Sequence, residues 1–290
     1  MKTFKQKKSL SLAYSSCPND TYIFHAIAAN IVTDPELDFT ITLADVETLN
    51  QKAGEGIFDV TKLSFAALGN LRDEYALLRT GAALGRGCGP LVVAKPGTEI
   101  VPGMQLRIAV PGLGTTACLL FRFFLEQRFP GIEAELTAMP FETVMPSVLK
   151  AESDLGVIIH EGRFVFGSLG LECLTDLGSW WEEHTGLPIP LGCIAVKRTL
   201  GSFVGKRIEV LIKQSIDHAA NNPESARQYI SEHAQELDNG VIDRHIGLYV
   251  NEFSSCLGKE GEAAIETFFK KGEQAGFIKP SKLPLFANQG

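Results

Sequence analysis

The fold of this chain can be read outward from one apolar run that ends in a histidine and a glycine: Gly156-Val157-Ile158-Ile159-His160-Glu161-Gly162. Three β-branched residues in succession predict a strand buried on both faces, as in a parallel sheet covered by helices. His160 then falls at the carboxyl end of this strand, where open α/β sheets bind their ligands. Because imidazole titrates near neutral pH, His160 is a candidate general base. The alternative is a strand-end histidine that only hydrogen-bonds a neighbouring loop.

Strands and helices alternate through the amino-terminal part of the chain. Strands are predicted at residues 9–14, 39–43 and 59–64, with a helix after the first strand capped by Asn19 or Asp20. Such alternation predicts parallel strands joined by right-handed crossovers. The end of the third strand, Lys62-Leu63-Ser64, is therefore expected at the same sheet edge as the other loops.

A second loop of interest follows the predicted strand at residues 106–110. Here Pro111-Gly112-Leu113-Gly114 leads into Thr115-Thr116-Ala117, which opens an apolar helix. Glycines allow close approach of the backbone, and free N–H groups at a helix start favour a carboxylate or phosphate. The pattern is equally typical of an ordinary capped helix. It lacks the GK[ST] of a nucleotide P-loop, and the glycine-rich residues 81–90 precede a strand instead of following one, which excludes a dinucleotide fingerprint.

Composition restricts the class of partner. The chain has 34 acidic and 27 basic residues, a net charge of -7, and no dense basic stripe, so a nucleic-acid partner is not expected. Six scattered cysteines show no zinc-site spacing and are expected to be reduced thiols. The Lys-rich start is followed by too short an apolar segment for an export signal, and no run is long enough to span a membrane. We therefore expect a cytoplasmic protein without a bound metal.

The layout predicts two lobes. Short strands at residues 91–95 and 194–197 flank a self-contained α/β block that contains the glycine loop and His160. The expected division is a discontinuous first lobe, 1–100 plus 197–290, and an inserted second lobe, 101–196. This is the layout of the type II periplasmic-binding-protein fold, an α/β fold with a ligand cleft between lobes. Beyond residue 205 the pattern is helical, and His218, His233 and His245 are expected to be surface or packing residues.

Several short motifs, in order along nearly the whole chain, resemble the 1,4-dihydroxy-6-naphthoate synthase family. They are Ser16-Cys17-Pro18-Asn19-Asp20-Thr21, Ala44-Asp45-Val46-Glu47-Thr48-Leu49-Asn50, Thr61-Lys62-Leu63-Ser64, Gly85-Arg86-Gly87, Thr115-Thr116-Ala117, Ile159-His160-Glu161, Trp180-Trp181-Glu182-Glu183 and Tyr249-Val250-Asn251. Each motif alone is weak, but their joint order and spacing are specific.

The resemblance implies a carbon–carbon lyase of the futalosine route to menaquinone, which converts cyclic dehypoxanthinylfutalosine to 1,4-dihydroxy-6-naphthoate and dihydroxyacetone. It implies His160 as proton acceptor, substrate contacts from Lys62, Leu63, Ser64, Thr116 and Ala117, and no cofactor or metal. The expected partner is a small-molecule carboxylate, bound by Ser64 and the helix start at Thr116. Chorismate dehydratase of the same pathway and a non-catalytic solute-binding protein are the alternatives. The oligomeric state does not follow from the sequence.

Overall fold

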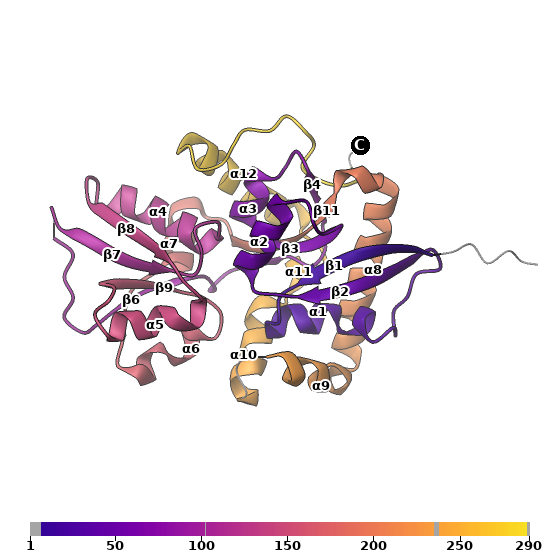
Figure 1. Cartoon of the computed structure of the whole chain (residues 1–290), viewed down its shortest axis with the longest axis horizontal. Coiled ribbons are helices and arrows are strands. Elements are labelled where there is room, and N and C mark those ends of the chain that lie inside the picture. Colours follow the sequence, from indigo (N-terminus) through magenta and orange to yellow (C-terminus); the bar gives the residue numbers. More distant parts are fainter. Residues whose placement is uncertain (1–6, 102, 235–237, 289–290) are drawn as a thin grey trace, which may run out of the picture.

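The computed structural model describes residues 7–101, 103–234 and 238–288, and shows two α/β lobes side by side (Figure 1). Residues 1–6 of the Lys-rich start lie outside the described residues. Within the described residues, no helix is long and apolar enough to cross a membrane. The cytoplasmic location stays a prediction.

The first lobe is built on a six-stranded mixed sheet. Its strands are β1 (Lys8–Tyr14), β2 (Leu37–Leu43), β3 (Val60–Ser64), β4 (Tyr75–Leu77), β5 (Ala83–Gly85) and β11 (Ile189–Lys197). The order is β2-β1-β3-β11-β4, and β5 also pairs with β11. As predicted, β1 is parallel to β2 and β3. β11 is antiparallel to its neighbours, since the chain returns from the second lobe in the opposite direction.

The second lobe is built on a five-stranded sheet of order β10-β6-β9-β7-β8. Its strands are β6 (Leu91–Ala94), β7 (Gln105–Val110), β8 (Glu133–Ala138), β9 (Leu155–Ile158) and β10 (Glu172–Asp176). The histidine-bearing run forms the central strand β9, which is buried along its whole length. Leu155 and Val157 belong to the apolar cluster that contains Leu120, and Ile158 packs in a cluster with Val144. A strand covered on both faces is what the β-branched run predicted.

Helices cover both sheets. In sequence order they are α1 (Pro18–Ala28), α2 (Val46–Gly54), α3 (Phe65–Asn70), α4 (Thr116–Arg128), α5 (Phe141–Leu149), α6 (Gly162–Val165), α7 (Leu177–Thr185), α8 (Gly201–Asn221), α9 (Pro223–His233), α10 (Asn239–Tyr249), α11 (Glu252–Ser255) and α12 (Gly258–Gln274). Two 3-10 turns, Phe166–Leu169 and Arg198–Leu200, complete them. Gly156 of β9 lets α5 approach closely, because a Cβ there would lie 2.9 Å from methyl groups of both Val144 and Val148.

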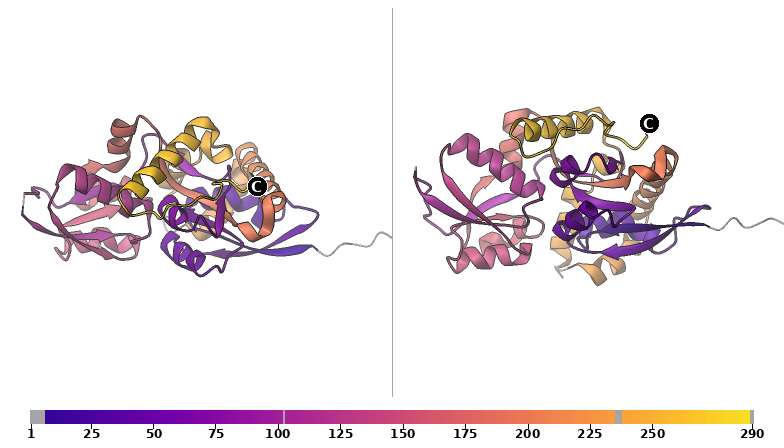
Figure 2. Two further views of the ribbon diagram at one scale, coloured as in Figure 1. Left: turned by 90° about the horizontal axis from the view of Figure 1, so that it is seen from above. Right: turned by 45° about the horizontal axis from the view of Figure 1, so that its top comes forward.

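The lobes meet along a shared apolar core. α12 lies across their junction (Figures 1 and 2), where the rings of Phe268 and Trp181 stand 5.7 Å apart. Strand pairing also bears on the predicted lobe boundaries, because β6 pairs within the second sheet and β11 within the first. Strand pairing thus favours passage of the chain between the lobes near residues 86–90 and 186–188, roughly ten residues before the predicted boundaries at 100/101 and 196/197. The predicted residue boundaries of the lobes stay a prediction.

Candidate active site

A cavity of about 90 Å³ lies between the lobes. It is lined by the β1–α1 turn, the ends of β3 and β11, the start of α4, the turn after β9 and one face of α10. Of the residues singled out from the sequence, five line this cavity: Lys62, Ser64, Thr116, Ala117 and His160. Leu63 does not, because its side chain is fully buried in the apolar core.

His160 sits in the turn between β9 and α6 with an unusual backbone. Its φ is 53°, in the left-handed region that costs a residue with a Cβ about 1 to 2 kcal/mol. The turn is held by Arg163, which donates 2.5 Å to Asp176 and 3.0 Å to the carbonyl of Gly89. Such strain persists where the surrounding structure imposes it, and it is concentrated at functional sites.

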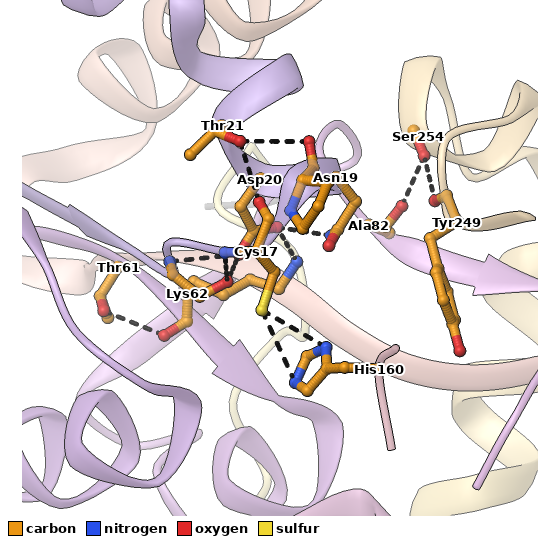
Figure 3. Close-up of polar contacts among 12 residues, drawn as sticks. Cys17, Asn19, Asp20, Thr21, Thr61, Lys62, Ala82, His160, Tyr249 and Ser254 are labelled. Atoms are coloured by element: carbon orange, nitrogen blue, oxygen red, sulfur yellow. Dashed lines mark hydrogen bonds and ion pairs between the residues drawn. The ribbon is translucent and has the colours of Figure 1, made fainter. Parts of the chain in front are cut away.

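The imidazole of His160 is enclosed by groups from both lobes. The Cys17 Sγ lies 3.4 Å from Nδ1 (Figure 3). The ring of Phe141 stands 5.1 Å away, and the ring of His245 stacks nearly parallel at 5.9 Å and 11°. Burial lowers the pKa of His160 from 6.5, so the ring is neutral and basic at neutral pH. Burial raises the pKa of the Cys17 thiol, so this sulfur stays protonated and is no nucleophile.

A buried polar chain runs from β3 to α10. The Lys62 ammonium lies 2.6 Å from the Asp20 carboxylate, with side chains only 6% and 0% exposed. Asn19 donates its amide N–H to the same carboxylate oxygen at 2.8 Å, and its amide oxygen lies 3.0 Å from Nε2 of His245. The other Asp20 oxygen accepts from the backbone and hydroxyl of Ser15. Most of this chain is drawn in Figure 3.

The Ser64 hydroxyl is fully engaged within the protein. It donates to the carbonyl of Gly114 at 2.8 Å, and it accepts from the backbone N–H of Ala67 and the amide of Asn50. Its one proton is therefore used for a bond from β3 to the glycine loop of the other lobe. In this arrangement the hydroxyl has no proton left for a carboxylate.

The Thr116 hydroxyl makes a similar contact between the lobes. It donates to the carbonyl of Leu191 at 2.8 Å and accepts from the N–H of Ala66. Thr115 is the N-cap of α4, accepting from the N–H of Cys118 at 3.2 Å. Among the described residues the backbone N–H groups of Thr116 and Ala117 have no acceptor. These two donors begin a helix of 13 residues, the local geometry that the sequence predicted, and their use as an anion site stays a prediction.

Several cavity residues were not predicted to have a role at the site, among them Asn19, Asp20, His245 and Tyr249. Asn19 or Asp20 was expected to cap α1, but the N-cap is Cys17, followed by Pro18. The Asp20 carboxylate instead turns back to Ser15 and Lys62. His245 was expected at the surface or in packing, and it is fully buried in the cavity wall. No local signal could have found it, because its partner Asn19 is 226 residues away. Within the described residues, no group of three or more His, Cys, Asp or Glu side chains is arranged for a metal ion.

Solved structures confirm the predicted fold class. A protein from Archaeoglobus fulgidus aligns with a TM-score of 0.84 and 35% identity, over 93% of this chain and 98% of that one. The alkanesulfonate-binding protein SsuA from Xanthomonas axonopodis aligns with a TM-score of 0.69 over 97% of both chains. At 10% identity the second likeness shows only that the chain has the periplasmic-binding-protein-like fold.

Sequence comparisons identify the family. A family model described as menaquinone biosynthesis matches residues 10–274. Two curated relatives, from Streptomyces coelicolor and Thermus thermophilus, are both named 1,4-dihydroxy-6-naphtoate synthase. Each is 44% identical to this chain, over 93% of it and 95% of the Streptomyces protein, and over 96% of it and 99% of the Thermus protein. The chain therefore belongs to the menaquinone biosynthesis family, among relatives that are 1,4-dihydroxy-6-naphthoate synthases.

Proposed function

We propose that this enzyme is a carbon–carbon lyase that converts cyclic dehypoxanthinylfutalosine to 1,4-dihydroxy-6-naphthoate with release of dihydroxyacetone. The names of the two relatives support the product. The observation that carries the proposal is the placement of His160, a neutral imidazole held in a strained turn, in the same cavity as the free N–H groups of α4. A base and an anion site in one enclosed cavity suit a substrate that bears a carboxylate.

The carboxylate of the substrate is held at the α4 end of the cavity. The N–H groups of Thr116 and Ala117 donate to it, and the helix dipole adds to the attraction. The Lys62 ammonium lines the same cavity, and within the described residues its one hydrogen-bond partner is Asp20, so two of its protons are free for the substrate. Ser64 acts indirectly, by holding Gly114 and hence the loop before α4.

His160 then acts as the general base. It removes a proton next to a carbonyl of the bound substrate, and the fragmentation that follows is favoured by formation of the aromatic ring. Burial keeps the imidazole in its neutral, accepting form. Anchoring of the carboxylate fixes the reacting carbon in one orientation to the base. The loss of orientational entropy then occurs on binding and does not add to the barrier of the proton transfer. The bonds between the lobes help to exclude water from the reactive intermediate.

One incubation tests the proposal. Purified protein is mixed separately with cyclic dehypoxanthinylfutalosine and with chorismate, and the products are separated by chromatography. We expect 1,4-dihydroxy-6-naphthoate and dihydroxyacetone in equal amounts from the first mixture and no change in the second. Loss of chorismate would indicate a dehydratase. Binding without any product, in either mixture, would indicate a solute-binding protein.

A further inference from the structure

Two aromatic side chains of α10 face the cavity without a role in the steps above. His245 and Tyr249 are one helical turn apart, which places them on the same face of the helix, and their ring centroids are 4.7 Å apart. Both line the cavity and are 0% and 7% exposed. We refer to these two residues as the α10 pair. α10 lies on the side of the first lobe that faces the second (Figure 1), where Arg244 stacks on Phe164 at 5.3 Å.

The proton on His245 can be assigned from its partners. The Asn19 amide nitrogen donates to Asp20, so the Asn19 oxygen is the atom that faces His245. This oxygen only accepts, which means that Nε2 of His245 carries the proton and Nδ1 carries a lone pair. Nδ1 is buried and, among the residues that the structure describes, has no hydrogen-bond partner. Burial lowers the pKa of His245 well below 6.5, so Nδ1 remains an acceptor at neutral pH.

Tyr249 supplies the complementary group. Burial raises the pKa of its phenol, so the O–H stays protonated and can donate. Within the part of the chain that the structure describes, this hydroxyl has no hydrogen bond. The cavity wall therefore presents a free acceptor and a free donor side by side. Nδ1 of His245 is a buried atom without a hydrogen bond within the described residues. Such an atom costs about 1 to 3 kcal/mol, which a ligand hydroxyl group would recover.

We propose that the α10 pair recognises the hydroxylated three-carbon part of the substrate, with Nδ1 of His245 accepting from one hydroxyl and Tyr249 donating to another. The inference rests on the proposed function, since the released fragment is a dihydroxy ketone. It also fits the geometry of the base, because the His245 ring stacks 5.9 Å from that of His160. The fragment that leaves would thus be held beside the base, while the carboxylate is held at the start of α4. The α10 pair determines specificity and does not take part in proton transfer.

The test compares two ligands that differ in the three-carbon part. His245→Gln keeps a donor for Asn19 and removes the Nδ1 acceptor, and Tyr249→Phe removes only a hydroxyl. His184→Gln is the control, since His184 is exposed and lies outside the cavity. For each protein, kcat/KM is measured with cyclic dehypoxanthinylfutalosine, and the Kd of 1,4-dihydroxy-6-naphthoate, which lacks the three-carbon part, is measured by calorimetry.

We expect each α10 variant to lower kcat/KM about tenfold, the effect of one hydrogen bond, and to change the Kd of the naphthoate less than about twofold. Equal weakening of both ligands would overturn the inference, because it would show a general loosening of the cavity. Unchanged kcat/KM in both variants would overturn it as well. If His245→Gln does not fold, Tyr249→Phe decides alone. The activity of the parent protein is measured first. If the parent does not convert the substrate, the proposed function is overturned instead.

Discussion

Replacing Ser64 by alanine should destabilise the protein as a whole more than it impairs carboxylate recognition. The hydroxyl bonds the Gly114 carbonyl at 2.8 Å, the Ala67 N–H at 3.1 Å and the Asn50 amide at 3.2 Å. Ser64 is only 3% exposed, so water cannot readily replace these bonds. Ser64 is the N-cap of α3, through its bond from the Ala67 N–H. Loss of this cap costs about 1 kcal/mol, and each of the other two bonds about 0.5 to 1.5 kcal/mol. The free energy of unfolding should therefore fall by roughly 2 to 4 kcal/mol.

Urea unfolding of the parent and Ser64→Ala measures this difference. Ser168→Ala is the control, because Ser168 is exposed and its hydroxyl bonds one local carbonyl, and its effect should stay within about 0.5 kcal/mol. The Kd values of 1,4-dihydroxy-6-naphthoate and of the same diol without its carboxylate are then compared. A similar change for both ligands is expected. The reasoning is refuted if Ser64→Ala is as stable as the parent, or if only the carboxylate-bearing ligand is lost, which would make Ser64 a direct ligand.

Three further predictions concern charges and protons. His160→Asn should lower kcat about 100- to 10,000-fold with Kd nearly unchanged, and the acid limb of the parent's kcat should lie below pH 6.5, because burial lowers the pKa of His160; a limb above pH 7 would contradict this. Asp20→Asn should lower the free energy of unfolding by about 3 to 5 kcal/mol, because it leaves Lys62 buried and unpaired. Adding Lys62→Met to this variant should restore much of the lost stability. An Asp20→Asn protein as stable as the parent would refute the importance of the ion pair. Burial lowers the pKa values of His160 and His245 in the folded protein, so below about pH 6.5 both histidines take up protons in the unfolded chain first. The free energy of unfolding should therefore fall by about 1.4 kcal/mol per pH unit for each histidine. Urea midpoints that do not change from pH 7 to pH 5 would exclude this effect.

Local patterns predicted the elements of the site well. The β-branched run gave the central strand β9 with a histidine after it, and the glycine loop gave a helix start with free N–H groups. These features depend on neighbours in the sequence, such as the Thr115 cap on Cys118. The comparisons also confirm the family that the motifs indicated.

The sequence did not predict which hydrogen-bond partners each side chain of the site has. Ser64 and the helix start at Thr116 were expected to bind the carboxylate. The hydroxyls of both residues bond carbonyls of distant segments, at Gly114 and Leu191, which leaves the N–H groups of α4 for that role. His245 looked like one more residue of an amphipathic helix, because its contacts with Asn19 and His160 exist only after the lobes have packed. Pairings between residues so far apart in the chain depend on tertiary structure, which local periodicity does not encode.

The left-handed backbone conformation of His160 lowers the stability of the fold at the position of the proposed base. Glycine adopts a φ of 53° without the penalty that a Cβ brings, and asparagine tolerates it better than most residues. His160→Gly could therefore gain about 1 kcal/mol of folding stability while abolishing the base. A directed-evolution experiment that selected thermostability alone would tend to discard this histidine, whereas one that also required menaquinone synthesis for growth would retain it.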